Sequence, residues 1–298
     1  MRAPSLTALA RHYAVTDGSR FRLSRVDPGD TRGLEIKDHA KTLLEQGVRR
    51  TAELQERLYA QDRWAVLLIF QAMDAAGKDS TIKHVMSGVN PQGCEVHSFK
   101  TPSTEELDHD FLWRALRVLP RRGHIGIFNR SYYEEVLVVR VHPDYLARQQ
   151  LPDQLVTKRI WKERFADIRD VERYLHRQGV VIRKFFLHVS RDEQRRRFLS
   201  RLDEPEKNWK FSLADVHERE HFPDYMRAYE DMIRHTATPY APWYVVPADH
   251  KWFTRLVVSS AIIETLESLQ PRFPTVDAKT RRELGVARAA LESEDQGA

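Results

Sequence analysis

A segment with the residue types and order of a phosphate-binding loop runs Asp74-Ala75-Ala76-Gly77-Lys78-Asp79. In the general pattern G-x-x-x-x-G-K-[ST], backbone N–H groups surround phosphate oxygens and the Lys side chain reaches the outer phosphates. Gly77 and Lys78 match, whereas Ala72 stands where the first Gly belongs and Asp79 where Ser or Thr would hold magnesium. The apolar run 64–72 before the segment and the helical pattern after it favour a phosphate loop over an ordinary strand-to-helix turn.

Asp74 is a candidate metal ligand within this loop. A carboxylate among phosphates repels them unless a cation lies between, so Asp74 predicts Mg²⁺, with Mn²⁺ as a substitute, in the working complex. The alternative is that Asp74 only caps the following helix.

Polar side chains also follow two later strand-like runs. Lys100 comes after the first, and the second ends in Asn129-Arg130-Ser131-Tyr132-Tyr133-Glu134. Ligands of parallel sheets bind at the carboxyl ends of the strands, where these residues are expected to meet the loop. Arg130 would offer a phosphate a fork of donors.

Asn129 and Glu134 complete the predicted metal shell around Asp74. An Asn can position a metal-bound water or a phosphate oxygen but brings no charge, so Glu134 is the candidate for the second carboxylate. Asn129 could instead serve as a helix N-cap, and both roles can coexist.

A basic cluster at 191–210 reads RDEQRRRFLSRLDEPEKNWK. We expect a mobile lid at about 195–212 that closes over phosphates, excludes water and neutralises charge during transfer. Its candidate nucleotide contacts, together with Tyr133 and Glu134 outside it, are Arg197, Arg201, Lys207 and Lys210. Arg195 and Arg196 fit a solvated charged helix equally well.

Five strand-like runs alternate with helical stretches, at 64–72, 94–99, 124–129, 180–189 and 243–248. This alternation predicts an α/β fold in which helices cover both faces of a five-stranded parallel sheet. Two S-x-x-E capping boxes mark helix starts, at Ser103 and at Ser190, and Gly179 is expected to end a long helix over 153–178.

The domain layout follows from the same pattern. We expect an N-terminal helical extension over 1–62, a phosphotransferase domain over 63–272, and a polar tail over 273–298 that is either a loose helix or disordered. We find no internal repeat and no low-complexity linker.

Composition indicates a soluble globular protein of 298 residues with 41% hydrophobic and 31% charged residues. It has no stretch of about 18 apolar residues and no signal segment, so we expect a cytoplasmic protein that does not contact a membrane. The single Cys94 cannot form an internal disulfide.

The net charge of +5 suggests an anionic partner. The 13 His are scattered, and no H-E-x-x-H zinc motif or hydrolase triad is present.

Five blocks resemble the polyphosphate kinase 2 family: FQAMDAAGKDST, NPQGCEVHSFK, FLWRALRVLPRRGHIGIFNRSYYEEVLV, EQRRRFLSRLDEPEKNWKFS and TATPYAPWYVVPADHKWFTRL. They span residues 64 to about 256 in the family's order and spacing. The resemblance implies a three-layer α/β/α P-loop kinase fold akin to thymidylate kinase, with a helical lid. It also implies transfer of the terminal phosphoryl group of inorganic polyphosphate to AMP, ADP or both with Mg²⁺, giving ADP or ATP.

The family's functional residues map onto this chain by motif. Its loop Asp and Lys fall on Asp74 and Lys78, its second motif on residues 129–134, and its basic lid on 195–210. Many members carry Asp where this chain has Asn129, a departure that leaves the exact metal shell open and resembles the branch whose members accept AMP, ADP or both. A homo-oligomer, dimer or tetramer, is expected.

Polyphosphate is a linear polyanion, so we predict a basic channel for it that contains Lys83, Lys100 and Arg121 or Arg122. Each of these could also be a solvated surface residue. Two other functions remain possible: an ATP-dependent nucleoside monophosphate kinase, and a basic P-loop protein that binds nucleic acid, for which no readout motif is found.

Overall fold

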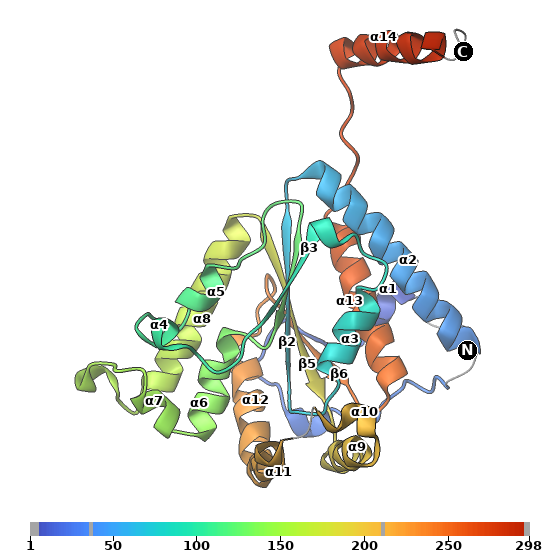
Figure 1. Cartoon of the computed structure of the whole chain (residues 1–298). Coiled ribbons are helices and arrows are strands. Elements are labelled where there is room, and N and C mark those ends of the chain that lie inside the picture. The colour runs from blue at the N-terminus through green and yellow to red at the C-terminus, as the bar shows by residue number, and fades with distance from the viewer. Residues whose placement is uncertain (1–5, 36–37, 210–211, 295–298) are drawn as a thin grey trace.

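The computed structural model describes residues 6–35, 38–209 and 212–294. A six-stranded sheet lies between two layers of helices (Figure 1). The strands are, in spatial order, β1 (Ala14–Val15), β6 (Trp243–Pro247), β5 (Val180–His188), β2 (Ala65–Ala72), β4 (Ile125–Asn129) and β3 (Cys94–Ser98). Strands β2 to β6 are mutually parallel, and they are the five strands that the sequence predicted.

The expected five-strand count was wrong by one edge strand. β1 pairs antiparallel with β6, with Ala14 opposite Tyr244, so the sheet is mixed. A strand of two residues is too short to show an alternating pattern, which is why the sequence did not reveal it. The N-terminal segment therefore contributes to the sheet as well as to the helical layers.

Helices cover both faces of the sheet (Figure 1). One layer contains α1 (Leu6–Leu9), α2 (Asp38–Gln61), α3 (Lys78–Val85) and α13 (Lys251–Ser268). The other contains α5 (Trp113–Leu116), α6 (Val138–Val141), α8 (Ile160–Arg177) and α12 (Phe222–Thr236). The short helices α4 (Thr104–Leu107) and α7 (Asp144–Ala147) lie beside the second layer. The predicted helix over 153–178 is a 3₁₀ turn, Asp153–Leu155, followed by α8.

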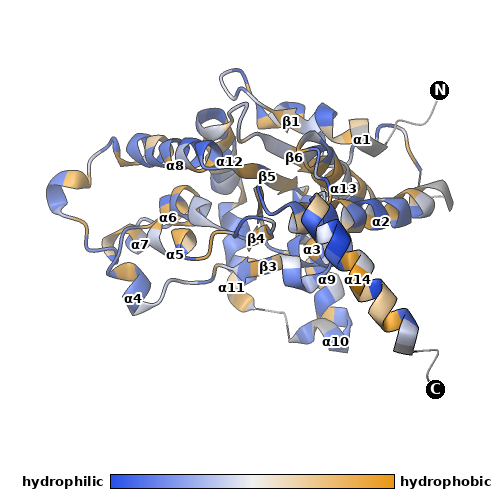
Figure 2. Cartoon of the chain, turned by 90° about the horizontal axis from the view of Figure 1, so that it is seen from above, coloured by the Kyte–Doolittle hydropathy of each residue, from blue (hydrophilic) through white to orange (hydrophobic). Residues whose placement is uncertain are grey.

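The remaining helices lie at the ends of the sheet. At the end where the parallel strands finish are α9 (Arg191–Asp203), α10 (Pro205–Asn208) and α11 (Leu213–Glu218). At the opposite end, α14 (Ala278–Glu294) stands away from the body (Figure 1), and hydrophobic residues recur along it (Figure 2). Its Leu284, Val286 and Leu291 are exposed. No helix among the described residues is long and apolar enough to cross a membrane.

The central strand β2 owes its place to its composition. All eight of its residues are buried, and it pairs with β4 on one side and β5 on the other. A strand buried on both faces reads as a continuous apolar run, which is what AVLLIFQA shows. Two of the marked helix boundaries are confirmed: Ser103 forms a complete capping box with Glu106, and Gly179 ends α8 with φ +82°.

One ion pair is buried completely between the sheet and α8. Lys184 of β5 donates from Nζ to Glu172 Oε2 at 2.7 Å, and neither side chain is exposed. Tyr132 and Tyr133, in the turn after β4, donate their hydroxyl groups to Glu172 Oε1 at 3.0 and 2.7 Å. Burial lowers the pKa of Lys184, and Glu172 opposes that shift. The network fixes the turn that follows β4 from behind.

Candidate functional site

A cavity of about 560 Å³ opens where β2, β3 and β4 end. Residues 73–77, called the β2–α3 loop from here on, form one wall together with the start of α3. Other walls come from the end of β3, from Asn129 at the end of β4 and Arg130 just after it, and from Ser200 and Arg201 of α9. The topology thus brings the sequence-predicted loop, strand ends and lid residues to one place.

The β2–α3 loop makes its turn with two left-handed residues. Gly77 has φ +101°, a conformation that a glycine adopts without strain, and Ala75 has φ +62°, which is uncommon for a residue with a side chain. Lys78 is buried at the first position of α3, and its Nζ donates to the carbonyl oxygen of Ala72 at 3.0 Å. Burial lowers the pKa of Lys78, the Arg130 charge adds to that, and Asp74 and Glu134 oppose it.

Asp74, Arg130 and Glu134 form a charged cluster beside Lys78. Arg130 Nη2 lies 2.7 Å from Asp74 Oδ1, and Arg130 Nη1 lies 3.6 Å from Glu134 Oε2. Arg130 has φ +61°, so its backbone is held in an uncommon conformation where the chain leaves β4. Gln71 satisfies its neighbours when its amide NH₂ donates to Glu134 Oε1 at 2.8 Å and its oxygen accepts from Ser131.

The two carboxylates of this cluster have opposite electrostatic surroundings. Burial alone would raise the pKa of Asp74, but the charges of Lys78, Arg130 and Arg201 outweigh it, so the pKa of Asp74 is lowered. At Glu134 burial prevails over Arg130 and Lys78, and the pKa is raised. Asp74 is therefore the better anionic ligand of the two.

Asn129 forms its hydrogen bonds with residues outside that charged cluster. Its Nδ2 donates to Asp79 Oδ1 at 2.8 Å and lies 3.4 Å from Ser98 Oγ. Asp79, at the position where the general pattern has Ser or Thr, is thereby linked to the end of β4. This bond connects the start of α3 to two neighbouring strands of the sheet.

A divalent cation fits this donor set only together with substrate. Among the described residues, no three His, Cys, Asp or Glu side chains are gathered so that they could hold a metal ion by themselves. Mg²⁺ is usually bound through one or two carboxylates plus substrate phosphates, with several waters retained. The ionised Asp74, at the edge of a cavity rich in cationic groups, suits that mode.

The predicted lid residues are placed in different ways. Arg201 lines the cavity, and its Nη1 lies 3.8 Å from Asp215 Oδ2 of α11. Arg197 is buried and donates to backbone carbonyl groups rather than standing free in a mobile cover. Lys210 and the side chain of Lys207 lie outside the described part of the chain.

Several predicted contacts do not reach the cavity. Arg121 and Arg122 precede β4 and therefore lie at the opposite end of the parallel sheet, where Arg122 donates to the carbonyl oxygens of Arg63 and Gln178. Lys83 is exposed on α3 and is not part of the cavity lining, whereas Lys100 is. Tyr133 is fully buried in the Lys184–Glu172 network, so it supports the site from behind.

The structure also adds residues that the sequence interpretation missed. Lys251, at the first position of α13, lines the cavity, as do Ser98 and Thr101 at the end of β3. Lys251 follows β6 after three residues, so its place at a strand's carboxyl end was a usable signal.

The comparisons with known proteins agree with this geometry. A family profile described as Polyphosphate kinase 2 (PPK2) matches residues 35–274. An ADP-polyphosphate phosphotransferase of Rhodopseudomonas palustris is 54% identical over 279 residues, which cover 92% of this chain and 95% of the relative. An AMP/ADP-polyphosphate phosphotransferase of Meiothermus ruber is 45% identical over 273 residues, covering 91% and 98%.

A solved structure gives the same result at the level of the fold. The crystal structure of polyphosphate kinase 2 from Arthrobacter aurescens superposes with a TM-score of 0.86 at 39% identity, over 96% of this chain and 99% of that one. The family profile covers most of the chain, and both relatives match it nearly end to end. This chain therefore belongs to the polyphosphate kinase 2 family.

Proposed function

We propose that this chain transfers the terminal phosphoryl group of inorganic polyphosphate to AMP, ADP or both, in one direct in-line step that requires Mg²⁺. The polyphosphate-dependent phosphorylation of a nucleotide rests on the family and on the names of the relatives. The observation that carries the direct transfer is the convergence of Asp74, Lys78, Arg130 and Arg201 on a single cavity.

The fold supports a P-loop kinase of the thymidylate kinase type. A buried central strand leads into a tight loop, the loop leads into a helix N-terminus, and a lysine stands at the first helical position. Such an arrangement directs backbone N–H groups and the positive end of the helix dipole at anions.

Charge neutralisation and alignment are what these residues supply. Phosphoryl transfer through a loose transition state spreads negative charge over the equatorial oxygens of the transferred group, and it needs positioning more than a base. Lys78 and Arg130 would contact those oxygens from the loop side, and Arg201 from α9. Mg²⁺ held by Asp74 would neutralise phosphate charge, and Lys78 would have to leave the Ala72 carbonyl to reach a substrate.

Arg130 would also change its partner on substrate binding, from Asp74 to a phosphate. Without substrate it lies between Asp74 and Glu134. With phosphate and a divalent cation bound, Asp74 would hold the cation and Arg130 would donate to the phosphate. Its guanidinium provides two parallel donors for that contact.

The acceptor is the part of the proposal on which the relatives differ. One is named for ADP and the other for AMP and ADP. Lys100 would bind phosphates of polyphosphate away from the transferred group, since it lines the cavity and is exposed. A cytoplasmic location, a homo-oligomer and the absence of nucleic-acid binding are carried over from the sequence as part of the proposal.

One experiment tests the proposal. The purified chain is incubated with AMP or ADP, separately, with polyphosphate or ATP as the donor, with Mg²⁺, Mn²⁺ or EDTA, and the nucleotides are resolved by chromatography. We expect ADP or ATP to form from polyphosphate only when a divalent cation is present. Transfer from ATP to AMP without use of polyphosphate would support an ATP-dependent monophosphate kinase instead.

A further inference from the structure

The β2–α3 loop holds Ala75 at φ +62°, and Ala72, the last residue of β2 before it, stands where the general pattern has its first glycine. The left-handed Ala75 opposes the tight turn, because a residue with a side chain disfavours that conformation by an amount of order 1 kcal/mol or more. Other contacts must therefore hold the loop. Four of its backbone carbonyl groups accept hydrogen bonds from side chains, those of Asp74, Ala75, Ala76 and Gly77, and the carbonyl group of Ala72 just before the loop does the same.

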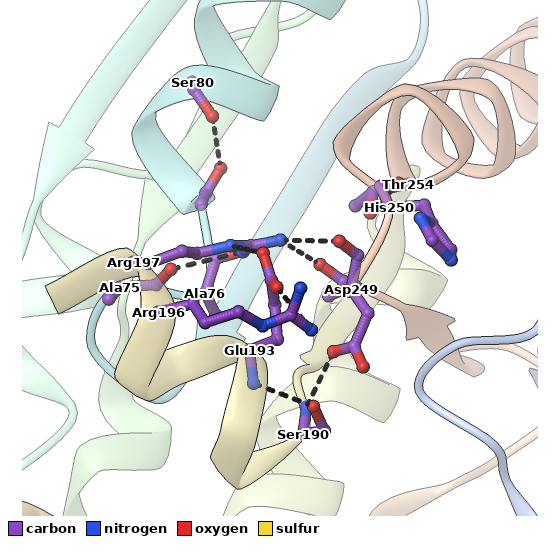
Figure 3. A network of polar contacts seen from close by, with 12 residues as sticks. Ala75, Ala76, Ser80, Ser190, Glu193, Arg196, Arg197, Asp249, His250 and Thr254 are labelled. Atoms are coloured by element: carbon purple, nitrogen blue, oxygen red, sulfur yellow. Dashed lines mark hydrogen bonds and ion pairs between the residues drawn. The ribbon is translucent and has the colours of Figure 1, made fainter. Parts of the chain in front are cut away.

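Arg197 of α9 supplies two of these bonds and connects three parts of the chain (Figure 3). Its Nη1 donates to the carbonyl oxygens of Ala75 and Ala76 at 3.2 and 2.7 Å. Its Nη2 donates to those of Ala248 and Asp249, after β6, at 2.6 and 3.1 Å. Its Nε donates to Glu193 Oε1 at 2.7 Å. A guanidinium has five N–H donors, and these five contacts use all of them.

The Glu193 side chain binds Arg197 and does not complete the capping box at Ser190. The S-x-x-E sequence at Ser190 predicted a full capping box, in which the Glu193 side chain would accept from the Ser190 N–H. Ser190 Oγ does accept from the Glu193 N–H at 3.1 Å. The Ser190 N–H donates to Asp249 Oδ1 instead, at 2.8 Å, and the Glu193 carboxylate binds Arg197 and Arg196.

Gln194, the neighbouring residue on α9, provides the bond to Asp74. It is buried, and its Nε2 donates to the carbonyl oxygen of Asp74 at 2.9 Å. Its Oε1 accepts from Arg219 Nη1 at 3.0 Å, so the contact continues into the 3₁₀ turn Arg219–His221 that follows α11. Gln194 is not among the residues that line the cavity, so it does not touch what binds there.

We propose that Gln194 and Arg197 are positioning residues that hold the β2–α3 loop in its turn, with Ala75 left-handed, by fixing the carbonyl groups of the loop. A trans peptide unit is planar, with its N–H directed opposite to its C=O. Anchoring the carbonyl groups of Asp74 and Ala76 on α9 therefore fixes the N–H directions of Ala75 and Gly77, on the side away from α9. The Ala76 N–H closes the turn onto the Met73 carbonyl at 3.2 Å.

The inference rests on the proposed function for its kinetic consequence, but the tether itself can be measured without substrate. Hydrogen exchange by mass spectrometry on the ligand-free full chain reports the opening of residues 73–80. Kinetic assays with polyphosphate, Mg²⁺ and AMP or ADP report the effect on transfer. The variants are Gln194→Met, Arg197→Met and Arg197→Lys, with Arg196→Met as the matched control, since Arg196 contacts the same Glu193 but is 70% exposed.

Gln194→Met is the decisive variant because it removes one donor to the loop and touches nothing in the cavity. We expect exchange in 73–80 to become about tenfold faster and kcat/KM for polyphosphate to fall about tenfold, as for the loss of one hydrogen bond. Saturating tripolyphosphate should return the exchange to the wild-type rate. Peptides from β2 and α13 should exchange as in the wild type, which a general loss of stability would not allow.

Arg197→Met should lower kcat/KM about 100-fold, the size of effect that misplacing a reacting group produces. Arg197→Lys keeps the charge but has three donors in place of the planar fork, so it should restore less than about a tenth of the wild-type value. Arg196→Met should stay within about twofold of the wild type in both measurements.

Two results would overturn the inference: wild-type exchange and kinetics in Gln194→Met, or full activity in Arg197→Lys. If the wild-type chain itself failed to use polyphosphate, the proposed function would be wrong. The exchange data on the ligand-free variants would still decide whether α9 holds the loop.

Discussion

The β2–α3 loop and the pair of helices α10 and α11 both border the cavity end of the sheet, yet they are held very differently. The carbonyl groups of the loop accept hydrogen bonds from Gln194 and Arg197, and that of Ala72 just before it accepts one from Lys78. Helices α10 and α11 have four and six residues, and apolar side chains near them are exposed, 79% for Trp209 and 64% for Leu213. Helices this short are not stable without tertiary contacts.

From this comparison we propose a fixed phosphate-binding wall and a movable cover, with α9 shared between them. The first half of α9 carries Gln194 and Arg197, which are attached to the loop. Its second half carries Arg201 and leads into α10. A cationic side chain on the loop side should therefore contribute to the rate in every turnover. One on the cover should contribute only when the cover closes.

The largest expected effect is on the fixed wall. Lys78→Ala should lower kcat by about 1,000-fold while the fold stays intact, since it removes the cation that the loop directs at the phosphates. Lys83→Ala, on the exposed side of the same helix, is the control and should stay near the wild type. Activity of Lys78→Ala within about tenfold of the wild type, or ~1.4 kcal/mol of barrier, would show that the loop is not the transfer site.

Asp74→Asn should reduce Mg²⁺-dependent turnover about 100-fold, because the ionised ligand of the cation is lost. Titrating Mg²⁺ at fixed polyphosphate should show that the required concentration rises. Asn129→Asp should be tolerated or should change the metal and nucleotide preference, although it also places a carboxylate against Asp79. An unchanged Mg²⁺ requirement in Asp74→Asn would move the metal site to Glu134.

A smaller loss is expected on the cover. Arg201→Ala should lower kcat about tenfold, ~1.4 kcal/mol of barrier, with little change in the melting temperature. The exposed Arg195 on the same helix provides the control, Arg195→Ala. Equal losses in Lys78→Ala and Arg201→Ala would remove the distinction between wall and cover.

The smallest effect should come from the rim of the cavity. Lys100→Ala is expected to raise KM for polyphosphate about threefold, ~0.6 kcal/mol, as for an exposed charge contact. Arg121→Ala, at the far end of the sheet, should change nothing. Raising the ionic strength should weaken polyphosphate binding more than nucleotide binding, because the polyanion is held by more exposed charges. An effect of Arg121→Ala larger than that of Lys100→Ala would place polyphosphate on another face.

The sequence predicted the parts of the site that are marked by local pattern. The five parallel strands appeared as strand-like runs, and residues just after them, such as Asp74, Lys100 and Arg130, lie at the cavity as expected. Arg121 and Arg122 illustrate the reverse rule. They precede their strand, and the amino ends of parallel strands lie at the other side of the sheet.

The features that could not be predicted are contacts between residues distant in sequence, for which no sequence pattern exists. Arg197 was assigned to a lid because it belongs to a basic helix, whereas four of its five hydrogen bonds go to backbone carbonyl groups 50 or more residues away. Carbonyl groups occur at every residue, so no pattern shows which ones an arginine will bind. The β1 strand was missed for a similar reason, since its pairing with β6 is decided by contacts distant in sequence.

The buried Lys184–Glu172 pair limits how this sequence can change over time. Removing one member of a fully buried pair leaves an uncompensated charge, at a cost of about 3–5 kcal/mol, whereas replacing both by apolar residues can be neutral. Because Tyr132 and Tyr133 also bind Glu172, a single change would disturb the turn that carries Arg130 as well. Residues 172 and 184 should therefore be substituted together in evolution. A homologue in which one of them has changed would need a compensating change at the other to be both stable and active.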